Sequence, residues 1–326
     1  MRALVSGYYG YGNVGDEALL AGLLAGLHSR GIEPVVLSGD PRATHALHDV
    51  HAVDRYRGLP AAVARCDALV SGGGGLLQDV SSQRSLSYYL TVMRLARLLG
   101  KRVVVYGQSV GPLSQAGRRR VGRALRGVPI AVRDAPSAAL LGELGIEAER
   151  VADAALLLSA PARPNGVLPV LLIPRAGHDD LNDALLEAGR LLRAADVPVA
   201  VLGLHEREDA EATSRVSETL DVPLLRAPTH REALAHVAAT RYVLSARLHG
   251  LIFAAIAGVG FAGLVYDPKV AGFLADARAP LFERPVDARR LADAALAAQP
   301  PDADAVRQLR ERAEAGLDWL ALHILG

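Results

Sequence analysis

The sequence predicts an α/β protein built from two Rossmann-like domains facing a central cleft. Apolar β-rich runs alternate with helical patterns, which is typical of parallel sheets covered on both faces. The proline-containing stretch 156–169 interrupts this alternation, which then restarts. A chain of 326 residues is also long enough for two domains of about 150 residues each.

The first domain is expected over residues 1–160. Its strands are short and apolar, and a helical pattern follows most of them. The expected strands are 3–6, 34–37, 68–71, 102–106 and 129–132, and the expected helices are 16–29, 59–66, 86–99, 114–125 and 135–144.

The second domain is expected over residues 168–300, with a C-terminal helix in 301–326 that packs back on the body. The expected strands are 170–173, 198–202, 222–225, 242–244 and 261–265. The expected helices are 180–194, 205–220, 231–239, 248–257, 286–298 and 304–325. Ligands of such sheets gather at the carboxyl ends of the strands, so the informative residues should follow strands directly.

Composition narrows the class of protein. The net charge of +1 gives no general attraction to nucleic acid. A single cysteine, Cys66, fits a reducing compartment and hence a cytoplasmic location. The most apolar stretch, 251–266, is shorter than the roughly 20 residues that span a bilayer. Peripheral contact with the inner face of the plasma membrane and homo-oligomer formation through the C-terminal helix both stay open.

The first post-strand loop, "GYYGYGNVGDE", contains a G-x-G-x-x-G at Gly10, Gly12 and Gly15. A dinucleotide turn brings its glycines in directly after the strand and leaves the helix N-terminus bare for a pyrophosphate. Here three residues intervene, and acidic side chains occupy the first helical turn. Asp40, where a ribose-binding acid would stand, precedes a proline and serves equally well as a cap or turn residue.

The same loop gathers aromatic and polar side chains that suit a sugar. The alternative is a tight turn with packed rings. The candidate acceptor-binding or cleft-lining residues are Tyr8, Tyr9, Tyr11, Asn13 and Asp16.

The second loop, "GGGGLLQDVSSQRS", follows an apolar strand. Consecutive glycines let a ligand or another backbone approach closely, and the alternative is a flexible surface loop. Candidate residues here are Gly73, Gly74, Gln78, Asp79 and Arg84.

Cationic residues follow three further strands. Arg133 ends a strand and offers a planar fork to a carboxylate or phosphate, or forms a salt bridge. Arg247 and His249 open an otherwise apolar helix, where helix N–H groups favour an anion. Lys269 follows the next strand. An anionic ligand is the simplest account of these positions.

Taken together, the segments "SGYYGYGNVGDEALL", "VSGGGGLLQD", "YGQSVGPL", "AVRDAPS", "ARLHGLIFA" and "YDPKV" resemble the polysaccharide pyruvyl transferases, and specifically the CsaB type. They run in order from residue 6 to 270. The resemblance implies a glycosyltransferase-B-like fold and a cytoplasmic enzyme of cell-wall biogenesis. It also implies that the opening glycines are no dinucleotide fingerprint.

By that resemblance, phosphoenolpyruvate is a co-substrate, and no cofactor or metal is expected. A 4,6-linked pyruvate ketal forms on N-acetylmannosamine of a lipid-linked secondary cell-wall polymer precursor, which later anchors surface-layer proteins. Arg133, Arg247 and Lys269 are implied to clamp the donor. His249 is the expected proton-transfer residue, as acid or as base. One departure is Pro174, which stands beside Arg175 where the family tends to carry a hydroxyl.

Alternatives stay open at this point. A nucleotide-sugar glycosyltransferase would share the architecture, and an NAD oxidoreductase or a non-catalytic glycan-binding protein are further rivals. The basic run Arg118–Arg120 with Arg123 and Arg126 could meet a lipid diphosphate, although a solvated helix face is the favoured interpretation.

Overall fold

The computed structural model describes residues 1–80 and 82–326; Ser81, in the polar stretch after the glycines, lies outside the described residues. The chain divides into two compact units. The first comprises residues 1–11, 19–157 and 310–326, and the second comprises 12–18 and 158–309. Residues 12–18 were expected in the first domain, and the structure groups them with the second unit.

The first unit holds a parallel seven-stranded sheet in the order β3-β2-β1-β4-β5-β6-β7. Its strands are β1 (Arg2–Ser6), β2 (Glu33–Ser38), β3 (His51–Asp54), β4 (Ala68–Leu77), β5 (Arg102–Val110), β6 (Ile130–Val132) and β7 (Glu149–Arg150). Its helices are α1 (Val14–Ser29, shared with the second unit), α2 (Pro41–His48), α3 (Leu59–Arg65), α4 (Gln83–Leu98), α5 (Gln115–Leu125), α6 (Ala135–Glu143) and the 3₁₀ turn η1 (Ala154–Leu157).

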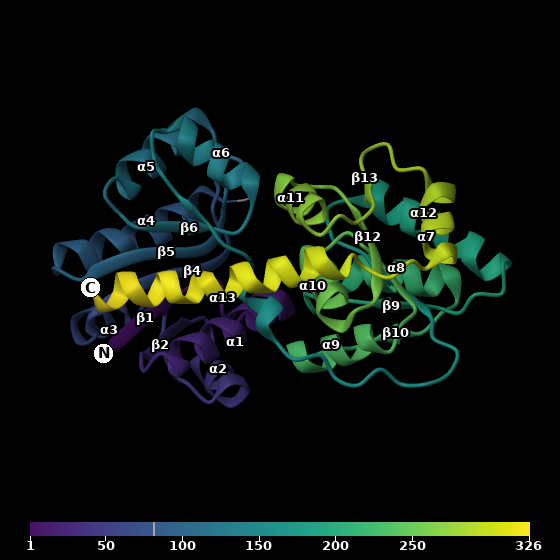
Figure 1. Ribbon diagram of the computed structural model, residues 1–326, viewed down its shortest axis with the longest axis horizontal. Coiled ribbons are helices and arrows are strands. Elements are labelled where there is room, and N and C mark those ends of the chain that lie inside the picture. The colour runs from purple at the N-terminus through teal and green to yellow at the C-terminus, as the bar shows by residue number, and fades with distance from the viewer. Residues whose placement is uncertain (81) are drawn as a thin grey trace. The chain divides into compact units, whose positions relative to one another are not determined.

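Helices cover both faces of this sheet (Figure 1), and an apolar cluster is buried on each face. Alternate residues of a strand point to opposite faces, so Leu4 joins one cluster while Val5 joins the other. The first cluster includes residues of α3, α4 and α5, and the second includes α1 and the end of α13 (Ala303–Leu325). In α13, Leu320 and Ile324 are fully buried against the first unit.

The second unit holds a parallel six-stranded sheet in the order β10-β9-β8-β11-β12-β13. Its strands are β8 (Val170–Ile173), β9 (Val199–Leu202), β10 (Leu224–Leu225), β11 (Tyr242–Ser245), β12 (Gly260–Leu264) and β13 (Leu281–Phe282). Its helices are α7 (Asp179–Ala194), α8 (Ala210–Leu220), α9 (His230–Ala238), α10 (Leu248–Ala257), α11 (Pro268–Asp276) and α12 (Ala288–Ala297). Among the described residues, no helix is both long enough and apolar enough to cross a bilayer.

Two parts of the sequence interpretation need correction. The four glycines 72–75 do not form a loop, because β4 continues through them and pairs with β5 as far as Leu77. Residues 205–209 do not begin a helix, because α8 starts only at Ala210. Helix α2 with strand β3 was not predicted at all. Asp40 is confirmed as a cap, since its carboxylate accepts from the amides of Arg42 and Ala43 at 3.1 and 3.0 Å.

Candidate active site

The second unit brings its predicted cations to one edge of its sheet. Arg247 and His249 follow β11, and Lys269 follows β12, the strand beside it. Arg175 follows β8 on the other side of β11. All the strands are parallel, so these residues lie at the carboxyl edge where ligands of such sheets bind. Arg133, expected to join them, belongs to the first unit.

Arg247 is a buried cation held by two acidic side chains. It is the N-cap residue of α10 and is 8% exposed. Its Nη2 donates to the fully buried carboxylate of Asp209 and lies 3.5 Å from Glu208 Oε2. Burial works to lower the pKa of Arg247, but Asp209, with smaller contributions from Tyr266 and Glu208, raises it overall. Its Nε has no hydrogen-bond partner among the described residues.

His249 occupies the first turn of α10 and is half-buried. Its ring lies 6.3 Å from the ring of Phe253 on the same helix. On another side it contacts Gly15, in the first turn of α1. A Cβ built on Gly15 would overlap the imidazole atoms Nδ1 and Cγ. The absence of a side chain at position 15 therefore leaves the space in which the His249 ring lies.

Tyr266 lies close to two cationic side chains. The Arg175 guanidinium lies 4.3 Å from the centroid of the Tyr266 ring, and the Lys269 Nζ lies 5.5 Å from it. Both distances suit cation–π attraction. Lys269 also pairs with Asp267, with Nζ to Oδ2 at 3.3 Å. Arg175 is thus held by an aromatic face, in a chain that carries Pro174 in place of the expected hydroxyl.

Residues 13 and 14, which belong to the second unit, make backbone contacts with the segment that follows β9. The amide of Val14 donates to the Leu204 carbonyl at 3.0 Å, and Asn13 forms an isolated β-bridge with His205. The Asn13 side chain accepts from the amide of Gly15 at 3.1 Å. Asp16 lies in the first turn of α1, in the same part of the second unit. These contacts place Asn13 and Asp16 in the unit that carries His249.

In the first unit, Arg133 forms part of a buried polar network. Its guanidinium pairs with Asp153 and donates from Nε to Ser109 Oγ at 2.9 Å. Ser109 donates in turn to Asp134 at 2.6 Å, and Asp134 accepts from the Ser137 amide at the start of α6. The salt-bridge alternative is thus realised in the structure. A donor contact by Arg133 stays a prediction.

The tyrosines of the opening loop divide into two kinds. Tyr8 and Tyr11 are half-buried and stack, with ring centroids 4.4 Å apart and an interplanar angle of 14°. Tyr9 is 1% exposed and belongs to the core beside α1. The ring of Tyr9 thus packs as in the tight-turn alternative, and contact of the opening loop with a sugar stays a prediction.

The glycines of β4 serve packing. A Cβ on Gly73 would overlap Leu19 of α1, so that face is filled by the helix. Gly74 is buried at φ +90°, beside the irregularity where β4 and β5 shift register. At Gly73 the absence of a side chain thus allows close approach of a helix, and ligand contact by either glycine stays a prediction.

The polar residues after β4 have structural partners. Asp79 accepts from the amide and hydroxyl of Ser114, the N-cap of α5, at 2.8 and 2.5 Å. These hydrogen bonds lower the pKa of Asp79. Gln78 accepts from the amide of Val80 at 2.9 Å. Arg84 is exposed in the first turn of α4.

The basic run of α5 is partly neutralised. Arg118 pairs with Glu143, and Arg120 donates to Ser87 at 2.7 Å. Arg119, Arg123 and Arg126 are exposed. This arrangement fits a solvated helix face.

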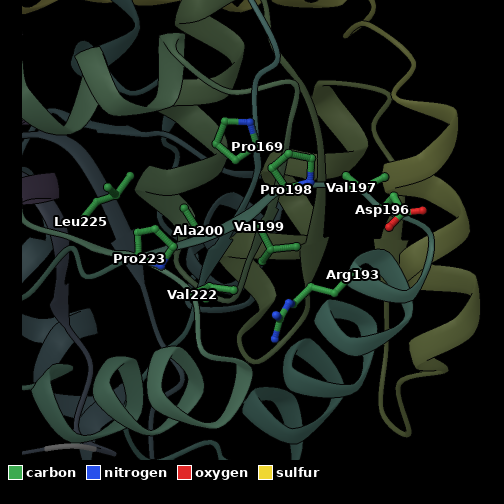
Figure 2. Close-up of a pocket in the computed structure, with 10 residues that line it drawn as sticks. All are labelled: Pro169, Arg193, Asp196, Val197, Pro198, Val199, Ala200, Val222, Pro223 and Leu225. Carbon is green, nitrogen blue, oxygen red and sulfur yellow. The ribbon is translucent and has the colours of Figure 1, made fainter.

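A cavity of about 540 Å³ lies in the second unit, and Figure 2 shows its lining. Pro169, Pro198 and Pro223 directly precede β8, β9 and β10, so the cavity lies at the amino edge of these strands. Its lining is mostly apolar, with Arg193 and Asp196 as its charged members. The cavity is therefore on the sheet edge opposite the cations described above.

At the carboxyl edge of the second sheet, the sequence interpretation missed Asp209 and Tyr266 and gave Arg175 no role. Asp209 was assigned to a helix, although a polar run directly after a strand was a usable signal. Tyr266 was passed over between the strand and Lys269. Arg175 was noted only as a residue of uncertain role, because nothing in the sequence shows that it lies over Tyr266.

A model of the polysaccharide pyruvyl transferase family matches residues 13–268. No curated protein sequence matches this chain.

Solved structures share the fold at low identity. S. aureus MnaA with UDP is 11% identical at a TM-score of 0.66, covering 99% of this chain and 96% of that one. Anabaena HepE in complex with UDP and glucose is 13% identical at 0.63, covering 98% and 95%. Acinetobacter baumannii MurG is 13% identical at 0.55, covering 99% of both. The two parallel-sheet units thus form a glycosyltransferase-B-like pair of Rossmann-like domains.

Proposed function

The chain belongs to the polysaccharide pyruvyl transferase family, and from this we propose that it is a phosphoenolpyruvate-dependent ketal-forming transferase. The acceptor in this proposal is an N-acetylmannosamine residue of a lipid-linked secondary cell-wall polysaccharide precursor, as in the CsaB type. The products are a 4,6-linked pyruvate ketal and phosphate. Such an acceptor places the reaction at the cytoplasmic face of the membrane.

The observation that carries the proposal is the cationic edge of the second unit. Arg247 and Lys269 open helices α10 and α11, whose first amides also favour an anion. Phosphoenolpyruvate carries a carboxylate and a phosphate. The guanidinium of Arg247 and the ammonium of Lys269 can each bind either of these anions. Lys269 is 20% exposed and pairs with Asp267, so a bound phosphate would compete with that carboxylate.

The reaction needs proton transfer at this edge. A proton added to the methylene carbon of phosphoenolpyruvate uses the electrons of its double bond and leaves cationic character at C2. One sugar hydroxyl then attacks C2 and loses its proton. The second hydroxyl then bonds to C2 and gives up its proton, while the phosphate leaves with the electron pair of its C–O bond and takes up one proton. His249 is half-buried between Gly15 and Phe253, and we assign it one of the proton transfers.

Phosphate release tests the proposal. The protein is incubated with phosphoenolpyruvate and a synthetic N-acetylmannosaminyl acceptor on a prenyl diphosphate, and wild type is compared with His249→Ala. We expect acceptor-dependent release that falls by about 10²-fold or more in the variant. His236→Ala, on α9 of the same unit, is the matched control and should stay near wild type. Acceptor-dependent release that survives in His249→Ala would move proton transfer to another residue.

A second candidate is a nucleotide-sugar glycosyltransferase. It is favoured by the fold shared with MurG and with HepE bound to UDP and glucose. The same acceptor is therefore offered with UDP-sugars in place of phosphoenolpyruvate. Sugar transfer without any use of phosphoenolpyruvate would replace the first proposal.

A further inference from the structure

Arg55 is a buried arginine surrounded by aromatic rings in the first unit. It follows β3 directly and is 5% exposed. Its guanidinium carbon lies 3.9 Å from the ring centroid of Tyr88, and 5.3, 5.4 and 5.5 Å from those of Tyr56, Tyr89 and Tyr11. These distances suit cation–π attraction from several rings at once. The arginine with these four tyrosines is called the Arg55 cluster below.

The charge of Arg55 has no carboxylate partner among residues 1–80 and 82–326. Its Nη1 donates to the Tyr11 hydroxyl at 3.1 Å, and its Nε is buried without a hydrogen-bond partner. The similarly buried Arg133 and Arg247 each pair with an aspartate. A buried charge without a carboxylate beside it is costly, and the groups that surround this guanidinium are neutral tyrosine rings. An anionic ligand would supply what the described residues do not.

The Arg55 cluster lies at the sheet edge where ligands of parallel sheets bind. Arg55 follows β3, Tyr11 lies in the segment after β1, and Tyr88 is on α4 after β4. The cluster therefore sits over the carboxyl ends of these parallel strands. Tyr56 is 65% exposed and Tyr11 is half-buried, so these two rings border solvent while Arg55 lies beneath the surface.

The cluster is also held in place before any ligand binds. The Tyr88 hydroxyl donates to the Arg55 carbonyl at 2.9 Å, and the ring of Tyr88 meets those of Tyr56 and Tyr89 edge to face. The carboxylate of Asp54 accepts from the amides of Tyr56 and Arg57, which fixes the turn after β3. A site with its side chains already positioned loses less entropy on binding.

We propose that the Arg55 cluster binds the anionic group of a glycan, with tyrosine rings against the sugar and the guanidinium on a phosphate or carboxylate. Aromatic faces pack well on the apolar face of a sugar ring, and arginine matches planar or tetrahedral oxyanions. This rests on the proposed function, because the glycan is taken to be the acceptor. The anion is either the diphosphate that links the glycan to its lipid or the carboxylate of an acidic sugar in the chain.

Three probes separate these sources. The first is an N-acetylmannosaminyl disaccharide on a short prenyl diphosphate, the second is the same disaccharide as a neutral alkyl glycoside, and the third is a neutral alkyl glycoside that also carries glucuronic acid. Binding is measured by titration calorimetry without phosphoenolpyruvate, so it does not depend on transfer. We expect one anionic probe to bind about tenfold or more tightly than the neutral one.

Variants then assign that preference to the Arg55 cluster. In Arg55→Gln we expect the preference for the anion to fall to about twofold or less. Arg55→Lys should be intermediate, because a lysine keeps the charge but cannot form the two parallel hydrogen bonds of a guanidinium. Arg57→Gln is the matched control: it removes one exposed charge two residues away and should keep the preference. Tyr56→Ala, at an exposed position, should weaken binding of all three probes and serves if Arg55→Gln does not fold.

Several outcomes would overturn the inference. These are equal binding of all three probes by wild type, an unchanged preference in folded Arg55→Gln, or unchanged binding of every probe by Tyr56→Ala. Weaker binding of phosphoenolpyruvate alone in Arg55→Gln would assign the arginine to the donor instead. Failure of the proposed function would look different, because the binding preference would persist while no acceptor released phosphate from phosphoenolpyruvate.

Discussion

Gly15 and His249 are in direct contact although they stand far apart in the sequence. The first turn of α1 passes so close to the imidazole that a Cβ on Gly15 would overlap its ring atoms. Both residues belong to the second unit, since residues 12–18 are grouped with it. The opening glycine motif therefore shapes the position of the residue that we assign to proton transfer.

Gly15→Ala should displace the His249 ring and reduce turnover. A displacement of about 1 Å at a reacting group can cost about 10²-fold in rate, and we expect a loss of that order. Phosphate release with phosphoenolpyruvate and acceptor measures it. Gly142→Ala is the control, because a Cβ at Gly142 of α6 meets nothing within 4 Å. Wild-type turnover in folded Gly15→Ala would contradict the role given to this contact.

Asp209→Asn should destabilise the second unit. Asp209 is fully buried and pairs with Arg247, whose side chain is 10% exposed. Removing one charge of a buried pair leaves the other uncompensated and costs about 3–5 kcal/mol of unfolding free energy. Denaturant titration measures this.

Glu208→Gln is the matched control for that prediction. Glu208 is 53% exposed and lies 3.5 Å from the same guanidinium, so its loss should cost less than about 1 kcal/mol. Equal costs for the two variants would show that burial does not set the strength of these pairs.

Tyr266 should contribute to donor affinity through the cations on its ring. Tyr266→Leu removes the aromatic face beneath Arg175 and Lys269, and we expect the KM for phosphoenolpyruvate to rise about three- to tenfold. Tyr266→Phe keeps the face and should stay within about twofold of wild type. An equal rise of KM in both variants would show that the hydroxyl and not the ring is the important group, and no rise in either would exclude Tyr266 from donor binding.

His205 should make the second unit less stable in acid. Burial lowers the pKa of His205 below its ordinary 6.5, and Arg247 and Arg175 lower it further, while Glu208 opposes them. Below pH 6.5 the unfolded chain therefore binds a proton that the folded state resists, so stability falls as pH drops. Thermal melting of His205→Gln across pH 5 to 7 should show a weaker dependence than wild type.

The exposed His51 provides the comparison for that experiment. His51→Gln should leave the pH dependence of the melting temperature as it is in wild type. An equally steep loss of stability in His205→Gln would exclude His205 as the source of the acid sensitivity.

Much of the fold follows from local sequence signals. Both parallel sheets were predicted, because buried strands in such sheets are continuous apolar runs with helices between them. The Asp-Pro pair at Asp40 indicated a possible helix cap. Strand β3, which follows that helix, is short and half-buried, so its apolar pattern was too weak to predict a strand. The run of four glycines was wrongly predicted to be a loop. It forms part of β4, where small residues leave room for the side chains of α1.

The candidate site was predictable only in part. The positions of Arg247, His249 and Lys269 after strands could be inferred, since parallel strands end at one edge. Their partners could not be, because the pairs Arg247–Asp209 and Gly15–His249 join distant segments of the chain. Arg55 gave no signal in the sequence, as its importance lies in four rings contributed by three separate segments.

The identity of the transfer product tests the central claim most directly. Wild type is incubated with phosphoenolpyruvate and the N-acetylmannosaminyl acceptor, and the product is analysed by mass spectrometry and NMR. The account predicts an acceptor heavier by one pyruvate ketal bridging O4 and O6, formed together with phosphate. An acceptor that stays unmodified with phosphoenolpyruvate, but gains a sugar from a nucleotide donor, would contradict it.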